Sequence, residues 1–279
     1  MDYTLNIRGR LLDLSEPCVM GILNATPDSF YDGSRVQTEH EIARRANEIV
    51  EQGGRIIDVG AFSTRPGAAE VSEAEEMSRL RQALSIVRRE QPDAVVSVDT
   101  FRPDVARMAV EELGADIIND VSEGGVTGIV NTPLADDGDA GVPAIFRMVS
   151  RLRVPYILMS VQPDLQQTLI AFASKVQQLR DLGQKDIILD PGFGFGKTLD
   201  ENYRLMAGMD RLKVLGLPLL VGVSRKSMIF RLLGTTPREA LNGTSVLNTV
   251  ALLHGASILR VHDVREAAEC IQIVNRLQP

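Results

Sequence analysis

The sequence predicts an α/β protein whose strands close into a (β/α)₈ barrel with an N-terminal β-hairpin at the bottom. Eight short apolar runs recur along the 279 residues, and each ends at a polar residue. The runs are apolar on both alternating sets of positions, as is typical of parallel strands covered on both faces. Helix signals separate them, and units of about 35 residues suit a barrel of about 250 residues. We expect a single barrel domain over residues 1–279.

The predicted strands follow one another at regular intervals. They lie at residues 18–24, 53–60, 94–99, 114–120, 155–160, 183–190, 217–224 and 255–262. Before them, the segment YTLNIRGRLLDL (3–14) places Arg-Gly between two alternating runs, which predicts the hairpin. An open doubly wound sheet could also hold eight strands, because spacing alone does not show closure.

Predicted helix starts consist of a hydroxyl residue followed three positions later by glutamate. These capping boxes are Thr38–Glu41, Ser72–Glu75, Thr198–Glu201 and Thr236–Glu239. Gly53, Gly114 and Gly183 suit the left-handed residue that follows a helix end. The glycine-rich, acidic stretch 124–142 is expected to be a surface loop.

Composition argues against several classes of protein. Thirty Lys and Arg against 37 Asp and Glu give a net charge of −7, which disfavours a non-specific nucleic-acid binder. We see no secretory signal, and the longest strongly apolar run, residues 217–223, is too short for a membrane span. Cys18 and Cys270 lie far apart without metal-like spacing, so we expect two buried thiols in a cytoplasmic protein.

The stretch DPGFGFGKT (190–198) looks like a nucleotide-binding loop but fails both common patterns. A P-loop needs glycine where Pro191 stands, and a dinucleotide fingerprint needs glycine at Lys197. We interpret the stretch as a strand-end loop in which Asp190 ends the strand and Thr198 caps the next helix.

The side chains of this loop have different expected roles. The Lys197 side chain is expected to be solvated. Either Phe193 or Phe195 covers a ligand ring, or both pack under the loop.

Polar side chains end all eight predicted strands, and in a barrel these ends meet at one mouth. They are Asn24, Asp58, Asp99, Asn119, Ser160, Asp190, Ser224 and Arg260. Asp99, Asn119 and Asp190 would point into this mouth and match a nitrogen heterocycle that bears amino and lactam groups. Cations in the same loops suit a phosphate-bearing substrate. They are Arg65, Arg225, Lys226, Arg260 and His262.

Seven motifs at these strand ends resemble those of the dihydropteroate synthases, nearly end to end and in order. They are MGILNATPDSFYDG (20–33), DVGAFSTRPGA (58–68), SVDTFRPDVA (97–106), INDVS (118–122), LDPGFGFGKT (189–198), GVSRKSMI (222–229) and LRVHD (259–263). The resemblance implies a folate-pathway transferase that is a sulfonamide target. It would join 6-hydroxymethyl-7,8-dihydropterin diphosphate to p-aminobenzoate, releasing 7,8-dihydropteroate and pyrophosphate. The family usually forms dimers.

The resemblance also implies two sets of site residues. The reacting centre would comprise Asn24, Arg65, Asp99, Asn119, Asp190, Lys226, Arg260 and His262. Further substrate-binding positions would be Asp32, Ser63, Thr64, Pro66, Met159, Phe195, Gly222 and Ser227.

By this resemblance the pterin is held by Asp99, Asn119, Asp190 and Lys226. Arg260, His262 and Asn24 hold the diphosphate, with Asn24 acting through Mg²⁺. The p-aminobenzoate pocket would lie between the two loops before residue 70 and the side chains of Phe195, Lys226 and Ser227.

Three departures and two alternative functions stay open. Ser160 stands where many members have histidine, Ala25 stands where valine is usual, and the acidic loop 124–142 is longer than is typical. A pterin-binding methyltransferase domain would share the barrel and the acids, but would not need residues 63–66 or the Arg260-x-His262 pair. A non-catalytic pterin-binding paralogue would be expected to lose Asp28, Asp32 or Arg65, and all three are present.

Overall fold

The computed structural model describes residues 3–25, 35–62, 71–125 and 141–277, and its core is a parallel eight-stranded sheet. The strands are β3 (Cys18–Asn24), β4 (Gly54–Gly60), β5 (Val95–Asp99), β6 (Ile117–Asp120), β7 (Tyr156–Met159), β8 (Ile187–Asp190), β9 (Leu220–Val221) and β10 (Ile258–Val261). Each predicted strand contains one of them. Their order in space is β8-β7-β6-β5-β4-β3-β10-β9.

A parallel bridge between Leu189 of β8 and Leu219, just before β9, joins the two ends of this order. The Leu189 N–H donates to the carbonyl of Pro218 at 2.9 Å. The sheet therefore closes on itself, which confirms the barrel and excludes the open doubly wound sheet.

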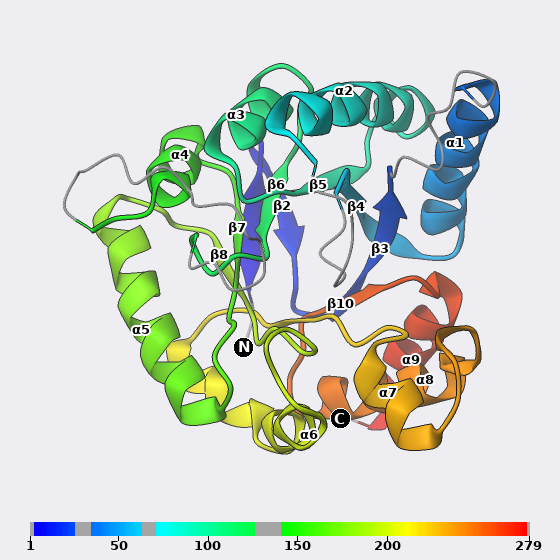
Figure 1. Ribbon diagram of the computed structural model, residues 1–279, viewed down its shortest axis with the longest axis vertical. Coiled ribbons are helices and arrows are strands. Elements are labelled where there is room, and N and C mark those ends of the chain that lie inside the picture. The colour runs from blue at the N-terminus through cyan, green and yellow to red at the C-terminus, as the bar shows by residue number, and fades with distance from the viewer. Residues whose placement is uncertain (1–2, 26–34, 63–70, 126–140, 278–279) are drawn as a thin grey trace.

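Helices surround the strands, as Figure 1 shows. They are α1 (Arg35–Glu51), α2 (Glu73–Glu90), α3 (Pro103–Glu111), α4 (Ala144–Leu152), α5 (Leu165–Asp181), α6 (Leu199–Ala207), α7 (Ser227–Leu233), α8 (Leu241–Leu253) and α9 (Val264–Leu277). None of the helices in the described ranges is long and apolar enough to cross a membrane.

The predicted capping boxes had mixed outcomes. Thr198 forms a complete box at α6, and Thr236 forms one at a short 3₁₀ helix, Pro237–Glu239. Ser72 caps α2 by accepting from the Glu75 N–H. The expectation for Thr38 was wrong, because α1 already begins at Arg35 and Thr38 lies inside it.

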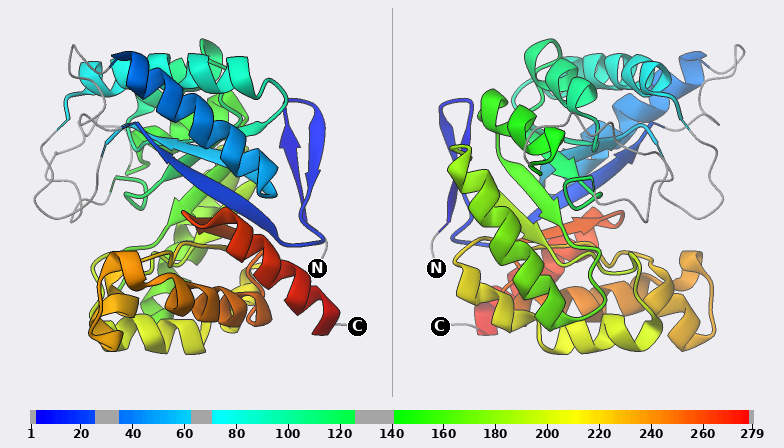
Figure 2. Two further views of the ribbon diagram at one scale, coloured as in Figure 1. Left: turned by 90° about the vertical axis from the view of Figure 1, so that its right-hand side faces the viewer. Right: turned by 60° about the vertical axis from the view of Figure 1, so that its left-hand side comes forward.

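The hairpin fills the end of the barrel at which the strands begin, which Figure 2 shows beside the start of β3. Its strands β1 (Thr4–Ile7) and β2 (Arg10–Asp13) pair antiparallel. Their inward side chains, such as Leu5 and Leu12, share one buried cluster with first residues of the barrel strands, such as Ile117. An ion pair of 2.7 Å from Arg8 to the buried Asp116 anchors the turn. The polar strand ends therefore meet at the opposite end of the barrel.

Candidate active site

Asp58, on β4, connects side chains from two other strands, β10 and β6. Its Oδ2 accepts from Arg260 Nε at 2.7 Å and from Asn119 Nδ2 at 3.3 Å. Arg260 also donates through Nη2 to Asp99 Oδ2 at 3.1 Å. Residues predicted from four separate strands thus form one contiguous network inside the mouth.

Three acceptor atoms of this network have no partner. Oδ1 of Asp58, of Asp99 and of Asn119 is buried without a hydrogen bond to any described residue. An unpaired buried acceptor costs roughly 1–3 kcal/mol, so a cluster of three indicates a ligand that brings its own donors.

Lys226 and Asp190 lie on the other side of the mouth. The Lys226 ammonium donates to the carbonyl of Phe193 at 2.5 Å and lies 4.4 Å from the centre of the Phe195 ring. Asp190 accepts from the Gly192 N–H at 2.8 Å. Phe193 itself is fully buried in the core, so Phe195 is the ring that faces the site.

Burial shifts the ionisation of these groups. It raises the pKa of Asp99 from 3.8 to about 8, against the opposing effect of Arg260. It also raises the pKa of Asp190, which Lys226 counteracts. Burial lowers the pKa of Lys226 from 10.5 to about 8, although Asp190 favours its charged form. The mouth is therefore a site in which charge is poorly solvated.

The predicted diphosphate residues surround the same opening. Asn24 Oδ1 and Asp99 Cβ both lie within 4 Å of the point at which a side chain on Gly60 would begin. His262 Nδ1 lies 3.0 Å from the hydroxyl of Ser224. Burial, and next Arg260, lower the pKa of His262 from 6.5 to about 4, so the free imidazole is neutral at pH 7.

Arg225 does not belong to the anion-binding set that the sequence suggested. Its guanidinium pairs with both oxygens of Asp263 and donates to the carbonyls of Pro237 and Arg238. Because these partners occupy its donors, Arg225 ties the loop after β9 to the start of α9.

The expectation that Lys197 is solvated was also wrong. Its ammonium donates to three main-chain carbonyls, those of Ser160, Gly192 and Phe195. The short run GFGFGK gave no sign of this arrangement, because the carbonyls converge only through the folding of two loops.

Comparison with known proteins assigns the chain to a family. Residues 20–262 match the family described as pterin binding enzyme. The dihydropteroate synthase of Escherichia coli K12 is 38% identical over 270 residues, which span 96% of this chain and 94% of that protein. This chain belongs to the dihydropteroate synthase family of pterin-binding transferases.

Solved structures agree with this assignment. The Xanthomonas albilineans dihydropteroate synthase with 4-aminobenzoic acid superimposes with a TM-score of 0.86 at 33% identity, covering 100% of this chain and 99% of that one. The Yersinia pestis dihydropteroate synthase with a sulfonamide drug superimposes with a TM-score of 0.81 at 35% identity, covering 99% of each chain.

The other predicted dihydropteroate synthase residues fall into two groups. Met159 is buried beneath the loop after β8, and Ser227 begins α7. Gly222 leaves room between Arg260 and Lys226, because a side chain there would meet both within 4 Å. The remaining predicted positions lie outside the described residues: Asp28, Asp32, Ser63, Thr64, Arg65, Pro66 and most of the acidic loop.

Sequence reasoning missed the site roles of Asp58 and Ser224. Both were noted as strand-end residues, and only the structure shows Asp58 joining Arg260 to Asn119 and Ser224 contacting His262. The sequence did carry one signal for Asp58: it is an aspartate inside an apolar run, and burying a carboxylate costs free energy unless it is paired or binds a ligand.

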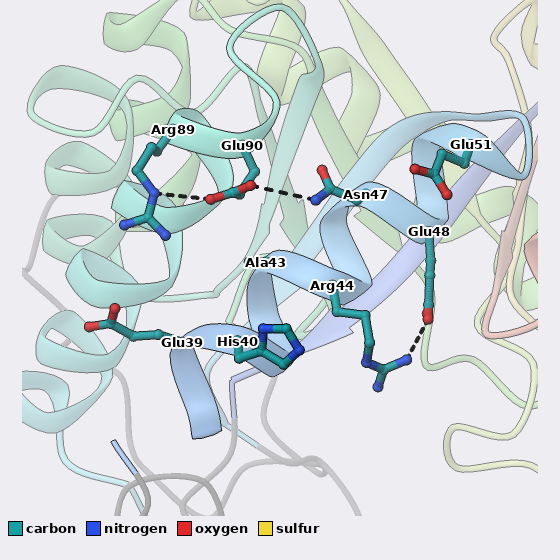
Figure 3. Close-up of a pocket in the computed structure, with 9 residues that line it drawn as sticks. All are labelled: Glu39, His40, Ala43, Arg44, Asn47, Glu48, Glu51, Arg89 and Glu90. Atoms are coloured by element: carbon teal, nitrogen blue, oxygen red, sulfur yellow. Dashed lines mark hydrogen bonds and ion pairs between the residues drawn. The ribbon is translucent and has the colours of Figure 1, made fainter. Parts of the chain in front are cut away.

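A shallow polar hollow lies elsewhere, between α1 and α2 on the outer helical layer (Figure 3). Its charges largely pair with one another: Arg44 with Glu48, and Arg89 with Glu90 at 3.0 Å. Asn47 donates to Glu90 at 3.5 Å. None of the buried, unpaired side-chain atoms of the described residues lines the hollow.

Proposed function

We propose that this protein joins 6-hydroxymethyl-7,8-dihydropterin diphosphate to p-aminobenzoate, releasing pyrophosphate. The observation that carries the proposal is the set of three unpaired buried acceptors on Asp58, Asp99 and Asn119. The amino and ring N–H groups of a pterin supply the donors that these atoms lack. Asp190 and Lys226 supply a further acceptor and a donor on the other side of the ring.

The leaving group sets the main chemical task. When the bond from the pterin methylene carbon to the diphosphate oxygen breaks, the electron pair goes to the diphosphate, and positive charge spreads over the pterin. Arg260 carries a permanent positive charge toward that region. His262, neutral in the free protein, offers a ring N–H to a phosphate oxygen.

The attacking amine needs little activation. An arylamine is neutral at pH 7, so its nitrogen lone pair attacks the methylene carbon directly and the lost proton passes to solvent. The described mouth accordingly needs to hold the two reactants in line rather than to supply a strong base. The Phe195 ring and the Lys226 side chain form the wall against which the ring of p-aminobenzoate lies. We expect sulfonamides to compete there.

Magnesium fits one position in this scheme. The exposed Asn24 side chain at the end of β3 presents an amide oxygen close to Asp99. No cluster of three or more acidic, His or Cys residues suits a metal among the described residues. A single amide oxygen from Asn24 matches an Mg²⁺ ion that is held mainly by diphosphate oxygens and water, which is the usual way in which proteins bind Mg²⁺ with a phosphate substrate. Bound there, Mg²⁺ would neutralise charge on the leaving diphosphate.

Release of pyrophosphate, measured with and without p-aminobenzoate, tests the function. Amine-dependent release is the expected result. Turnover of a methyl-folate substrate without pyrophosphate would indicate a methyltransferase domain instead. Tight pterin binding without any turnover would indicate a non-catalytic paralogue, and either result would contradict the proposal.

Homodimer formation through α7 and α8 belongs to the same proposal. The 13 residues of α8 include no charged side chain. Val246 and Leu253 are 55% and 50% exposed on its outer face, and Leu232 and Leu233 of the adjoining α7 are similarly exposed. A contiguous exposed apolar patch of this kind commonly marks a protein–protein interface. A cytoplasmic location fits the two buried, unpaired thiols of Cys18 and Cys270.

A further inference from the structure

Lys197 is enclosed by the backbone of two loops. Its Nζ donates to the carbonyl of Gly192 at 3.0 Å and to those of Ser160 and Phe195 at 3.2 Å each. Three carbonyls use all three donors of an ammonium group. Burial lowers the pKa of Lys197 to about 8, although Asp190 favours its charged form. The side chain therefore has no donor left for a substrate.

The two loops meet tightly at this lysine. Ser160 follows β7, whereas Gly192 and Phe195 follow β8. A side chain on Gly192 would begin 1.9 Å from the Ser160 oxygen, so the two backbones are in direct contact. The ammonium neutralises the carbonyl dipoles that this contact brings together.

The loop that Lys197 holds carries one wall of the site. The Phe195 N–H donates to the Gly192 carbonyl at 3.1 Å. The position of the Phe195 ring is therefore fixed by the same turn that Lys197 closes. Lys226 contacts the same turn twice, through the Phe193 carbonyl at 2.5 Å and the Phe195 ring at 4.4 Å. A displacement of the turn therefore moves Phe195 and Lys226 together.

Three of the proposed pterin acceptors do not depend on this turn, whereas Asp190 and Lys226, on the other side of the ring, adjoin it. Asp58, Asp99 and Asn119 lie on β4, β5 and β6, and their partners are one another and Arg260. The turn and these acceptors are thus separately supported parts of the mouth.

We propose that Lys197 is a positioning residue that sets the place of the Phe195 and Lys226 wall, and so governs p-aminobenzoate binding more than pterin binding. The inference rests on the proposed function. It concerns a residue that contacts neither substrate.

Lys197→Met removes the ammonium and keeps the length of the side chain. Lys185→Met is the matched control, because it makes the same change at an exposed lysine of the same α5–β8 region. Three quantities are compared: the KM for p-aminobenzoate, the Kd for the pterin diphosphate by isothermal titration, and the Tm. We expect K197M to raise the KM for p-aminobenzoate about tenfold or more while the pterin Kd changes less than about threefold. K185M should change neither.

An unchanged KM for p-aminobenzoate would overturn the inference. So would a parallel loss of pterin and p-aminobenzoate binding, which would show a general structural role. If K197M does not fold, Lys197→Gln, which keeps an N–H donor at shorter reach, is judged by the same criteria. A wild-type protein without amine-dependent pyrophosphate release would instead overturn the proposed function, and with it this inference.

Discussion

Asp99 couples ligand binding to stability through its proton. Burial raises its pKa from 3.8 to about 8, so the folded protein holds a proton that the unfolded chain releases near pH 4. The stabilisation due to this proton is complete below the unfolded pKa and is lost as the pH rises through the folded value. Ionisation of Asp99 in the free protein therefore lowers the stability of the fold, and a ligand that donates hydrogen bonds to the carboxylate can offset this loss.

Asp99→Asn should remove this dependence, because an amide does not titrate. Between about pH 5 and about pH 8, the stability of the wild type should fall relative to that of D99N, as measured by urea unfolding. Lys226 is present in both proteins, so its own titration largely cancels in the comparison. A stability difference that stays constant over this range would show that Asp99 has an ordinary pKa.

The position of residues at the mouth was predictable where the backbone alone fixes it. Asp99, Asn119 and Asp190 were placed there because each ends an apolar strand, and strand ends meet in a barrel. The roles of Arg225 and Lys197 depend on which carbonyls the folded loops bring near. Sequence spacing carries no information about those carbonyls.

At the scale of elements, the loop after β8 and the connection before β9 depend on glycine for two different reasons. Gly192 has φ +71° and no room for a side chain beside the Ser160 carbonyl. Gly216 has a similar φ of +65°, but a side chain there would meet no atom within 4 Å. Comparing alanine substitutions at Gly192 and Gly216 therefore distinguishes the free-energy cost of a left-handed backbone from that of a steric clash.

Gly216→Ala should lower the free energy of unfolding by about 1–2 kcal/mol through backbone strain alone. Gly192→Ala should cost more, because it must also separate the two loops. It should reduce activity as well, since the Gly192 N–H orients Asp190. Urea unfolding and initial rates measure both effects. Equal stability losses in the two variants would mean that the loops separate without cost.

Element boundaries show what local patterns can and cannot predict. The strands, the closing hairpin and the Thr198 cap followed from period and turn chemistry. The Thr38 prediction failed because a hydroxyl residue three positions before glutamate also occurs inside helices. The barrel closes through one bridge, between Leu189 and Leu219. The spacing of strands along the sequence does not predict which strands pair, so it could not predict this bridge.

At the scale of the whole molecule, the barrel separates stability from function. The hairpin and the first residues of the strands form an apolar plug at one end. The unpaired acceptors gather at the other end. The apolar α7–α8 surface lies on the outer helical layer (Figure 1).

The proposed dimer can be tested on that outer surface. Val246→Arg should convert a dimer to a monomer, because it places a charge in the buried part of the interface. Val214→Arg is the matched control, since Val214 is also exposed, at 79%, but lies in the 3₁₀ helix Met209–Leu215. Light scattering after size-exclusion chromatography gives the masses. A wild type that is monomeric, or a V246R variant that stays dimeric, would contradict the proposed interface.

The central claim is that the unpaired acceptors of the mouth bind the pterin, and Asn119→Leu tests it most directly. Asn248→Leu is the control, because Asn248 also has a buried, unpaired amide oxygen, but on α8. Isothermal titration with the pterin diphosphate should show at least about tenfold weaker binding for N119L and unchanged binding for N248L. Equal affinities for N119L and the wild type would contradict the account.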